Sequence, residues 1–408
     1  MADRILLYAT VSWPSAARYA GGFEAAGCDV FALSPNGAPV KASRYVVENY
    51  LYRPLAPLSS LRKAIRKSAA DLIVACDDRA IAHLLRLHQS EKRRAPAIAA
   101  LVARSLGIPE NYSRILSRSD SLSELRALGV RVPETLPVTS EAELDNCLAI
   151  TGFPAVLKSD GSWGGDGVVI AQTREEARSA YRRLSNAPAR WRSLARSVRR
   201  SDAHFLLAAL KPTPSAVCVQ RFISGHSAAS AFAASKGEIA GAFHYDVVVA
   251  QGTIGPPNVI RRVDCEEMDA ACRAVAKCFG LSGLHGLDFV RDATGAVHLI
   301  EINPRATQGG SLPFGAGRDL PSALAASIAG RSVDAREAID KDVVVFFPRE
   351  WQRDPASPYL KSGYHDVPWN DPAIVSAILG VPLKRPSRAL RRLPPVAPAR
   401  TIGIEPAE

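Results

Sequence analysis

Two carboxylates and an amide stand on two apolar segments whose pattern is typical of a β-hairpin. In HLIEIN, residues 298–303, Glu301 and Asn303 are two apart, so a strand directs both side chains to one face. The preceding segment, GLDFVRD, carries Asp288 and joins HLIEIN through a short turn. A turn of even length puts Asp288 on the same face as Glu301, whereas a change of one residue would separate them. Because a buried carboxylate without a partner costs several kcal/mol, this face requires a positive charge.

Asp288, Glu301 and Asn303 form an oxygen-only set of candidate metal ligands. Such a set suits Mg²⁺ (or Mn²⁺), which keeps water and phosphate oxygens in its remaining coordination positions. Arg305, two residues after Asn303, adds a planar cation beside that set. The alternative is a surface hairpin with incidental acids, which the apolar residues of HLIEI disfavour. The spacing therefore predicts a divalent-metal site.

A glycine-rich segment offers a phosphate cradle to accompany the metal. KSDGSWGGDGV, residues 158–168, begins with Lys158 at a predicted strand end. Its glycines, including the adjacent Gly164 and Gly165, let backbone N–H groups approach phosphate oxygens closely. It is not a Walker A loop, since no GK[ST] follows the glycines. Alone the segment suits a plain β-hairpin with glycine bulges equally well, but together with the carboxylate pair it favours nucleotide binding.

The elements that must position these residues change character along the chain. The first part alternates strands with helices, which implies a parallel sheet covered by helices. There we predict strands at 4–9, 29–34 and 71–78 and helices at 16–27 and 79–89. The later part reads as antiparallel strands with intervening helices. There we predict strands at 155–172 (interrupted by the glycine-rich loop), 216–225, 227–250 and 259–264, the hairpin strands, and helices at 120–135, 265–280 and 320–330.

The order of lysine, glycine-rich loop and metal hairpin resembles the ATP-grasp superfamily, including proteins like the carbamoyl-phosphate synthase large chain. The resemblance implies an α/β (α+β) protein with an N-terminal Rossmann-like preATP-grasp domain, residues 1–105, followed by a two-subdomain ATP-grasp fold, residues 106–333. Its glycine-loop subdomain would be 106–225 and its metal and substrate subdomain 226–333. Residues 334–408 would form a C-terminal extension with a mobile Pro/Arg-rich tail.

The resemblance also implies roles for individual residues and ATP with Mg²⁺ (or Mn²⁺) as cofactors. Arg118 occupies the place of the first nucleotide-binding lysine, Lys158 matches the second, and Gly164 and Gly165 match the phosphate loop. Arg305 would steady the substrate carboxylate or an acyl phosphate. The metal ligands implied are Asp288, Glu301 and Asn303.

The segment QRFISG, residues 220–225, resembles the part of the family that contacts adenine. Gln220 replaces the usual glutamate, and backbone groups of Arg221 and Ile223 would meet the adenine edge. Ser227 stands where the family has a ribose-binding acid. These replacements, with that at Arg118, leave the choice of nucleotide open.

Composition and charge indicate the kind of ligand, the state of the cysteines and the location of the protein. The 408 residues carry a net charge of +11, with arginines spread out except in one dense stretch at 174–200. This pattern favours attraction of anionic small molecules over nucleic-acid binding. The seven scattered cysteines include no CxxC pair, which indicates free thiols. No apolar run is long enough for a membrane span and no signal peptide is evident, so we expect a cytoplasmic protein.

The resemblance implies a ligase that phosphorylates a substrate carboxylate to an acyl phosphate, which an amine or thiol then attacks. The expected partners are therefore small-molecule carboxylate and amine or thiol substrates, and a homodimer is a candidate assembly. One alternative is a carboxylase or carbamoyl-phosphate type enzyme that uses bicarbonate. Another is a non-catalytic ATP-binding protein. His226 and His285 are candidate acid–base groups, although buried structural histidines are more common.

Overall fold

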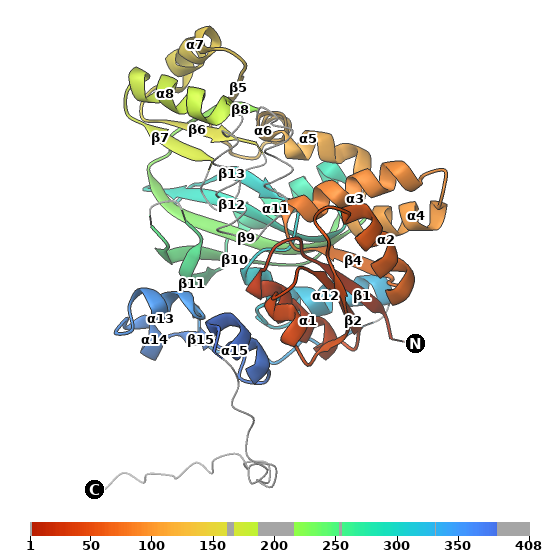
Figure 1. The fold of residues 1–408 in the computed structure, drawn as a ribbon. Coiled ribbons are helices and arrows are strands. Elements are labelled where there is room, and N and C mark those ends of the chain that lie inside the picture. The colour runs from red at the N-terminus through yellow and green to blue at the C-terminus, as the bar shows by residue number, and fades with distance from the viewer. Residues whose placement is uncertain (1, 161–166, 187–215, 253–254, 331, 382–408) are drawn as a thin grey trace, which may run out of the picture.

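The computed structural model describes residues 2–160, 167–186, 216–252, 255–330 and 332–381. The fold contains three sheets with helices packed on them (Figure 1). Gly164 and Gly165, the end of the arginine-rich stretch and the C-terminal tail lie outside the described residues.

The first sheet is parallel and has the strand order β3-β2-β1-β4. Its strands are β1 (Arg4–Tyr8), β2 (Asp29–Ser34), β3 (Val46–Leu51) and β4 (Leu72–Ala75). The helices of this unit are α1 (Pro14–Ala25), α2 (Pro57–Ser68), α3 (Asp78–Glu91) and α4 (Pro96–Leu106). The alternation predicted from sequence is confirmed. Strand β3 and helices α2 and α4 were not predicted, because β3 is an edge strand whose exposed residues break the apolar pattern.

A second, antiparallel sheet lies at the top of Figure 1 and has the order β5-β8-β6-β7. Its strands are β5 (Thr135–Val138), β6 (Ala155–Ser159), β7 (Val168–Ala171) and β8 (Val217–Arg221). Helices α7 (Glu141–Thr151) and α8 (Arg174–Ser185) pack on this sheet around a separate apolar cluster. Between the first two sheets in sequence lie α5 (Tyr112–Leu116) and α6 (Arg118–Ala127).

The third sheet has seven strands in the order β13-β12-β9-β10-β11-β14-β15, antiparallel except for the last pair. Its strands are β9 (Gly225–Ser235), β10 (Glu238–Ala250), β11 (Pro257–Val263), β12 (Gly283–Asp292), β13 (Val297–Asn303), β14 (Val343–Phe346) and β15 (Tyr364–Asp366). The remaining α-helices are α11 (Glu266–Phe279), α12 (Leu320–Ala329), α13 (Arg349–Arg353), α14 (Tyr359–Ser362) and α15 (Pro372–Leu379). Short 3-10 helices are η1 (Pro39–Ala42), η2 (Pro109–Asn111) and η3 (Gly309–Ser311).

Both faces of the third sheet are buried, and β9 shows how. Ala228, Phe232 and Ala234 pack in the cluster that includes α11, whereas Ala229 and Ala231 pack in the cluster that includes α1 and α12. This alternation follows from the two-residue period of a strand. One face of the sheet is therefore covered by α11 and the opposite face by α1 and α12.

The C-terminal extension is built onto two other parts of the fold. Its strand β14 pairs with β11, so the extension continues the third sheet. Asp366 in β15 forms an ion pair with Arg18 of α1, and Asp371 accepts a hydrogen bond from the Ser43 hydroxyl at 2.8 Å. These contacts hold the extension against the first domain, as Figure 1 shows for α15 and α1.

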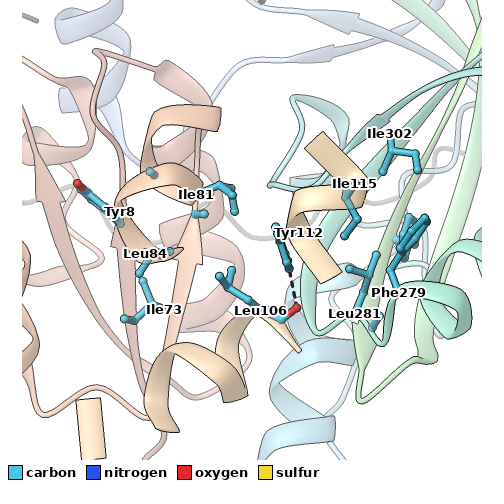
Figure 2. Packing of buried hydrophobic residues seen from close by; sticks show 14 of the residues in the cluster. Tyr8, Ile73, Ile81, Leu84, Leu106, Tyr112, Ile115, Phe279, Leu281 and Ile302 are labelled. Atoms are coloured by element: carbon cyan, nitrogen blue, oxygen red, sulfur yellow. Dashed lines mark hydrogen bonds between the residues drawn. The ribbon is translucent and has the colours of Figure 1, made fainter. Parts of the chain in front are cut away.

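One apolar cluster joins the first domain to the third sheet. Figure 2 shows it running from Ile73 and Leu84 through Leu106 and Tyr112 to Phe279. The Tyr112 hydroxyl is buried and donates to the Leu106 carbonyl at 3.0 Å. Tyr112 thus fills the seam between the two domains and satisfies its polar group there.

None of the seven cysteines, which all lie among the described residues, forms a disulfide, as the sequence predicted, and five of them are buried. Among the helices that the structure describes, none combines the length and apolar character needed to cross a membrane.

Tyr112→Ala should lower the free energy of unfolding by about 3–5 kcal/mol, because it empties a fully buried aromatic site at the seam. Tyr112→Phe keeps the ring and removes only the hydroxyl, so it should cost about 1 kcal/mol. Urea unfolding of both variants measures the difference. Equal, small losses would show that the seam repacks around the missing ring.

Candidate functional site

Asp288 in β12 and Glu301 in β13 lie directly opposite each other in the strand register. The predicted even-length turn is wrong, since Arg291 pairs with Val297 and five residues separate them. A β-bulge between the Asp288 and Phe289 pairings adds Ile300 and restores the register. The shared face that the sequence predicted is therefore present, although the bulge creates it and the turn does not.

The acid pair lies on the face of the third sheet that packs against α1 and α12. Asp288 also pairs with Ala229 of β9, which packs in the cluster containing α1 and α12. Residues directly opposite in a sheet project from the same side. The two acids therefore lie between the third sheet and the rest of the protein, where neighbouring elements supply cations.

Arg118, the first residue of α6, reaches both the acid pair and the small sheet. Its Nη2 donates to Glu301 Oε1 at 2.7 Å and its Nη1 to Asp160 Oδ1 at 3.2 Å. The Arg118 side chain is only 8% exposed, so these are shielded ion pairs. Sequence reasoning missed Asp160, which directly follows β6 and the lysine at its end.

Lys158 projects from β6 to the bulge in β13. Its Nζ donates to the Ile300 carbonyl at 3.4 Å. Burial disfavours the charged ammonium and, against the attraction of Glu301, lowers the Lys158 pKa to about 8. The bulge thus supplies a carbonyl acceptor for a buried lysine beside the acid pair.

Protonation of the two acids differs because their neighbours differ. Burial and the nearby Glu301 charge raise the pKa of Asp288 to about 6. Burial alone would raise the Glu301 pKa, but Arg118 and Lys158 outweigh it, so that pKa lies below its usual value. Asn303 Nδ2 donates to Asp288 Oδ2 at 2.9 Å, so the third candidate ligand lies beside the acid pair. A divalent cation would relieve the repulsion that raises the Asp288 pKa, so these residues fit Mg²⁺.

Arg305 connects the metal-ligand set to the first domain. Its Nη2 donates to Asn303 Oδ1 at 3.2 Å and its Nε to Asp78 Oδ1 at 3.0 Å. Asp78 was not among the predicted site residues, although it follows β4 at the carboxyl edge of a parallel sheet, where ligands commonly bind. Its neighbour Asp77 accepts hydrogen bonds from Thr10 and caps α3.

The segment predicted to contact adenine ends β8. Gln220 is buried and its side-chain amide donates to Thr135 Oγ1 at 2.9 Å, so this residue anchors the small sheet. The Arg221 amide donates to Glu134 O at 2.8 Å. Ile223 follows the strand and is partly buried, while Ser227 is exposed near the start of β9. The segment lies on the same sheet as Lys158.

The candidate acid–base histidines lie apart from this network. His285 is buried, its Nε2 is 2.9 Å from Ser282 O, and burial lowers its pKa to about 4. A neutral histidine packed on Phe232 has a structural role. His226 is exposed, with Nε2 3.5 Å from Asp246 Oδ1.

Comparisons with known proteins support the resemblance. An ATP-grasp domain model matches residues 196–309. The carbamoyl phosphate synthase large chain of Hyperthermus butylicus is 26% identical over 151 residues, a match that covers 37% of this chain and 14% of that protein.

Solved structures share the fold at low sequence identity. The biotin carboxylase domain of 2-oxoglutarate carboxylase from Hydrogenobacter thermophilus, in complex with MgADP, ADP and bicarbonate, has a TM-score of 0.58 at 14% identity, covering 83% of this chain and 72% of that chain. N5-carboxyaminoimidazole synthetase from Staphylococcus aureus, complexed with ADP, has a TM-score of 0.56 at 14% identity, covering 81% and 78%. These findings confirm the ATP-grasp resemblance and the predicted fold class. The domain boundaries and the roles of single residues stay predictions.

Glu301→Gln keeps the side-chain shape but replaces a charged candidate ligand with a neutral amide. Nucleotide-dependent activity should fall about 100-fold or more, because the lost charge no longer holds the metal. The metal-free unfolding free energy should change little, since Arg118 loses a charged partner while Asp288 loses a repelling one. ADP release and urea unfolding test this. A large loss of stability with normal ADP release would indicate a purely structural cluster.

Arg305→Lys keeps the charge but loses the planar fork that joins Asp78 to Asn303. We expect activity to fall about 10- to 100-fold. Arg104→Lys is the matched control, because exposed Arg104 of α4 donates to the Asp71 carbonyl at 3.3 Å and has no carboxylate partner among the described residues. Comparable ADP release by both variants would show that Arg305 has no part in the reaction.

Proposed function

We propose that the protein is an ATP- and Mg²⁺-dependent ligase, because residues 196–309 match an ATP-grasp domain and contain an acid pair that lies close to Arg118, Lys158 and Arg305. It transfers the γ-phosphoryl group of ATP to a substrate carboxylate. An amine or thiol then displaces phosphate from the acyl phosphate. The products are an amide or thioester, ADP and phosphate.

The observation that carries this proposal is the register of Asp288 and Glu301. Like charges directly opposite each other in a sheet destabilise it, so fold stability gives no reason for this pairing. Burial, together with the nearby Glu301 charge, raises the pKa of Asp288 to about 6. A bound divalent cation would explain the pairing, and Asn303, whose amide nitrogen donates to Asp288, carries the third candidate ligand oxygen.

The chain's own residues have distinct parts in this reaction. Lys158, from the strand that leads into the glycine-rich loop, would bind phosphate oxygens, and Arg118 would hold Glu301 in place. Arg305 would orient the substrate carboxylate with its planar guanidinium. Bound Mg²⁺ would offset the negative charge of the transferred group.

The proposed reaction has two steps, phosphoryl transfer and then displacement of phosphate. The bond between the γ-phosphorus and the bridging oxygen breaks as a carboxylate oxygen bonds to phosphorus, and ADP leaves. The amine or thiol then donates an electron pair to the carbonyl carbon, loses a proton, and expels phosphate. A carboxylate resists direct attack because of its resonance and charge, which is why the phosphoryl group must be added first.

A bicarbonate-dependent carboxylase is the second candidate. It is favoured by the fold shared with a biotin carboxylase domain solved in complex with bicarbonate. In that case bicarbonate takes the place of the carboxylate substrate. The same acid pair would bind the metal, and Arg305 would orient the bicarbonate.

We expect ATP turnover, screened against libraries of carboxylates with amines or thiols, to yield ADP and phosphate. Glu301→Gln provides the control for contaminating ATPases. ADP release that needs bicarbonate but no other acid would select the carboxylase. AMP and pyrophosphate as products would contradict phosphoryl transfer and indicate adenylation of the acid.

A further inference from the structure

The loop that follows the metal ligands leads to an arginine in the C-terminal extension. Gln308, three residues after Arg305, accepts a hydrogen bond from Arg349 Nη1 at 2.7 Å. Arg349 is the first residue of α13, directly after the end of β14 and its Phe347-Pro348 link. The extension therefore touches the loop that carries Arg305.

Arg349 differs from the other arginines of this region in its partners. Arg305, Arg18 and Arg336 each hold a carboxylate, respectively Asp78, Asp366 and Asp319. Within the described ranges, the hydrogen bond of Arg349 is to a neutral amide and it forms no ion pair.

Burial lowers the pKa of Arg349, and no carboxylate offsets this effect. A partly buried cation without an anion is costly, so an anionic ligand would stabilise it.

Further hydrogen-bond donors lie around the same loop. Gln308 lines a hollow together with Ser15 and Arg18 of α1 and with Phe346 and Asp366 of the extension. Arg18 Nε is buried and without a hydrogen-bond partner in the part of the chain that the structure describes.

The same holds for the hydroxyl of Thr307, next to Gln308, in those described residues. Two arginines and one aspartate leave this region with an excess of positive charge, because Asp366 already pairs with Arg18. The unsatisfied Arg18 Nε and Thr307 hydroxyl, together with the Arg349 guanidinium, suit a carboxylate or a phosphate.

We propose that Arg349, held by Gln308 and supported by Arg18 and Thr307, binds a second anionic group on the acid substrate. The inference rests on the proposed ligase function for the reacting carboxylate, which Arg305 orients. Gln308 follows Arg305 by three residues, at most about 10 Å of backbone, so both anions would bind along one short loop, which suits a single small molecule. The substrate class is thus a small dicarboxylate or a phosphorylated carboxylate.

The test separates this inference from the ligase reaction by measuring binding directly. Protein saturated with Mg²⁺ and a non-hydrolysable ATP analogue is titrated calorimetrically with propionate, succinate and 3-phosphonopropionate. The wild type should bind at least one of the two acids with a second anionic group about 10- to 100-fold more tightly than propionate, as expected for a charged hydrogen-bonded group. The better of the two identifies the second group as carboxylate or phosphate-like.

Variants then assign the preference to Arg349. Arg349→Met should remove it without changing affinity for the nucleotide analogue, and Arg349→Lys should restore part of it. Lys361→Met, which removes an exposed cation from α14 of the same extension, is the matched control and should behave as the wild type.

A wild type that binds all three acids equally, or an Arg349→Met protein that keeps the preference, would overturn the inference. Failure of the ligase proposal appears separately, as the absence of ADP release with every acid tested.

Discussion

The central constraint on this protein is the opposition of two carboxylates on neighbouring strands. Asp288 and Glu301 face each other in the register of β12 and β13, and their repulsion must be balanced by positive charge. Arg118, Lys158 and Arg305 approach the pair or its amide neighbour from three different parts of the chain. The arrangement of the three sheets can be understood as the means of bringing these cations to one hairpin.

These three cations connect the hairpin to other parts of the fold. Lys158 connects the small sheet to β13 through the Ile300 carbonyl, and Arg118 bonds Asp160 as well as Glu301. Arg305 connects the hairpin to Asp78 at the carboxyl edge of the parallel sheet. A nucleotide bound between the small sheet and the hairpin would therefore contact residues whose positions depend on one another. This coupling suits a reaction that needs phosphate, metal and acid substrate held together.

The C-terminal extension brings the loop after the hairpin into the same network. It continues the third sheet through β14 and pairs Asp366 with Arg18 of the first domain. Arg349 then meets Gln308 between these two attachments. The extension thus adds the positive charge of Arg349 beside the loop that carries Arg305, and the substrate preference proposed above rests on this placement.

The sequence by itself determined the hairpin and most of the other elements. Two-residue spacing placed Glu301 and Asn303 on one face, apolar periodicity located most strands and helices, and the order of the motifs indicated the ATP-grasp fold. These signals are local, so one segment at a time reveals them.

Only the tertiary structure decided how the hairpin is paired and charged. The turn is odd in length, and the bulge at Ile300 that corrects the register depends on packing along the whole strand. The contacts of Glu301 with Arg118, of Arg305 with Asp78 and of Gln308 with Arg349 join residues far apart in the chain. No periodicity in the sequence records such pairs, because their partners are selected by the packing of separate sheets against one another.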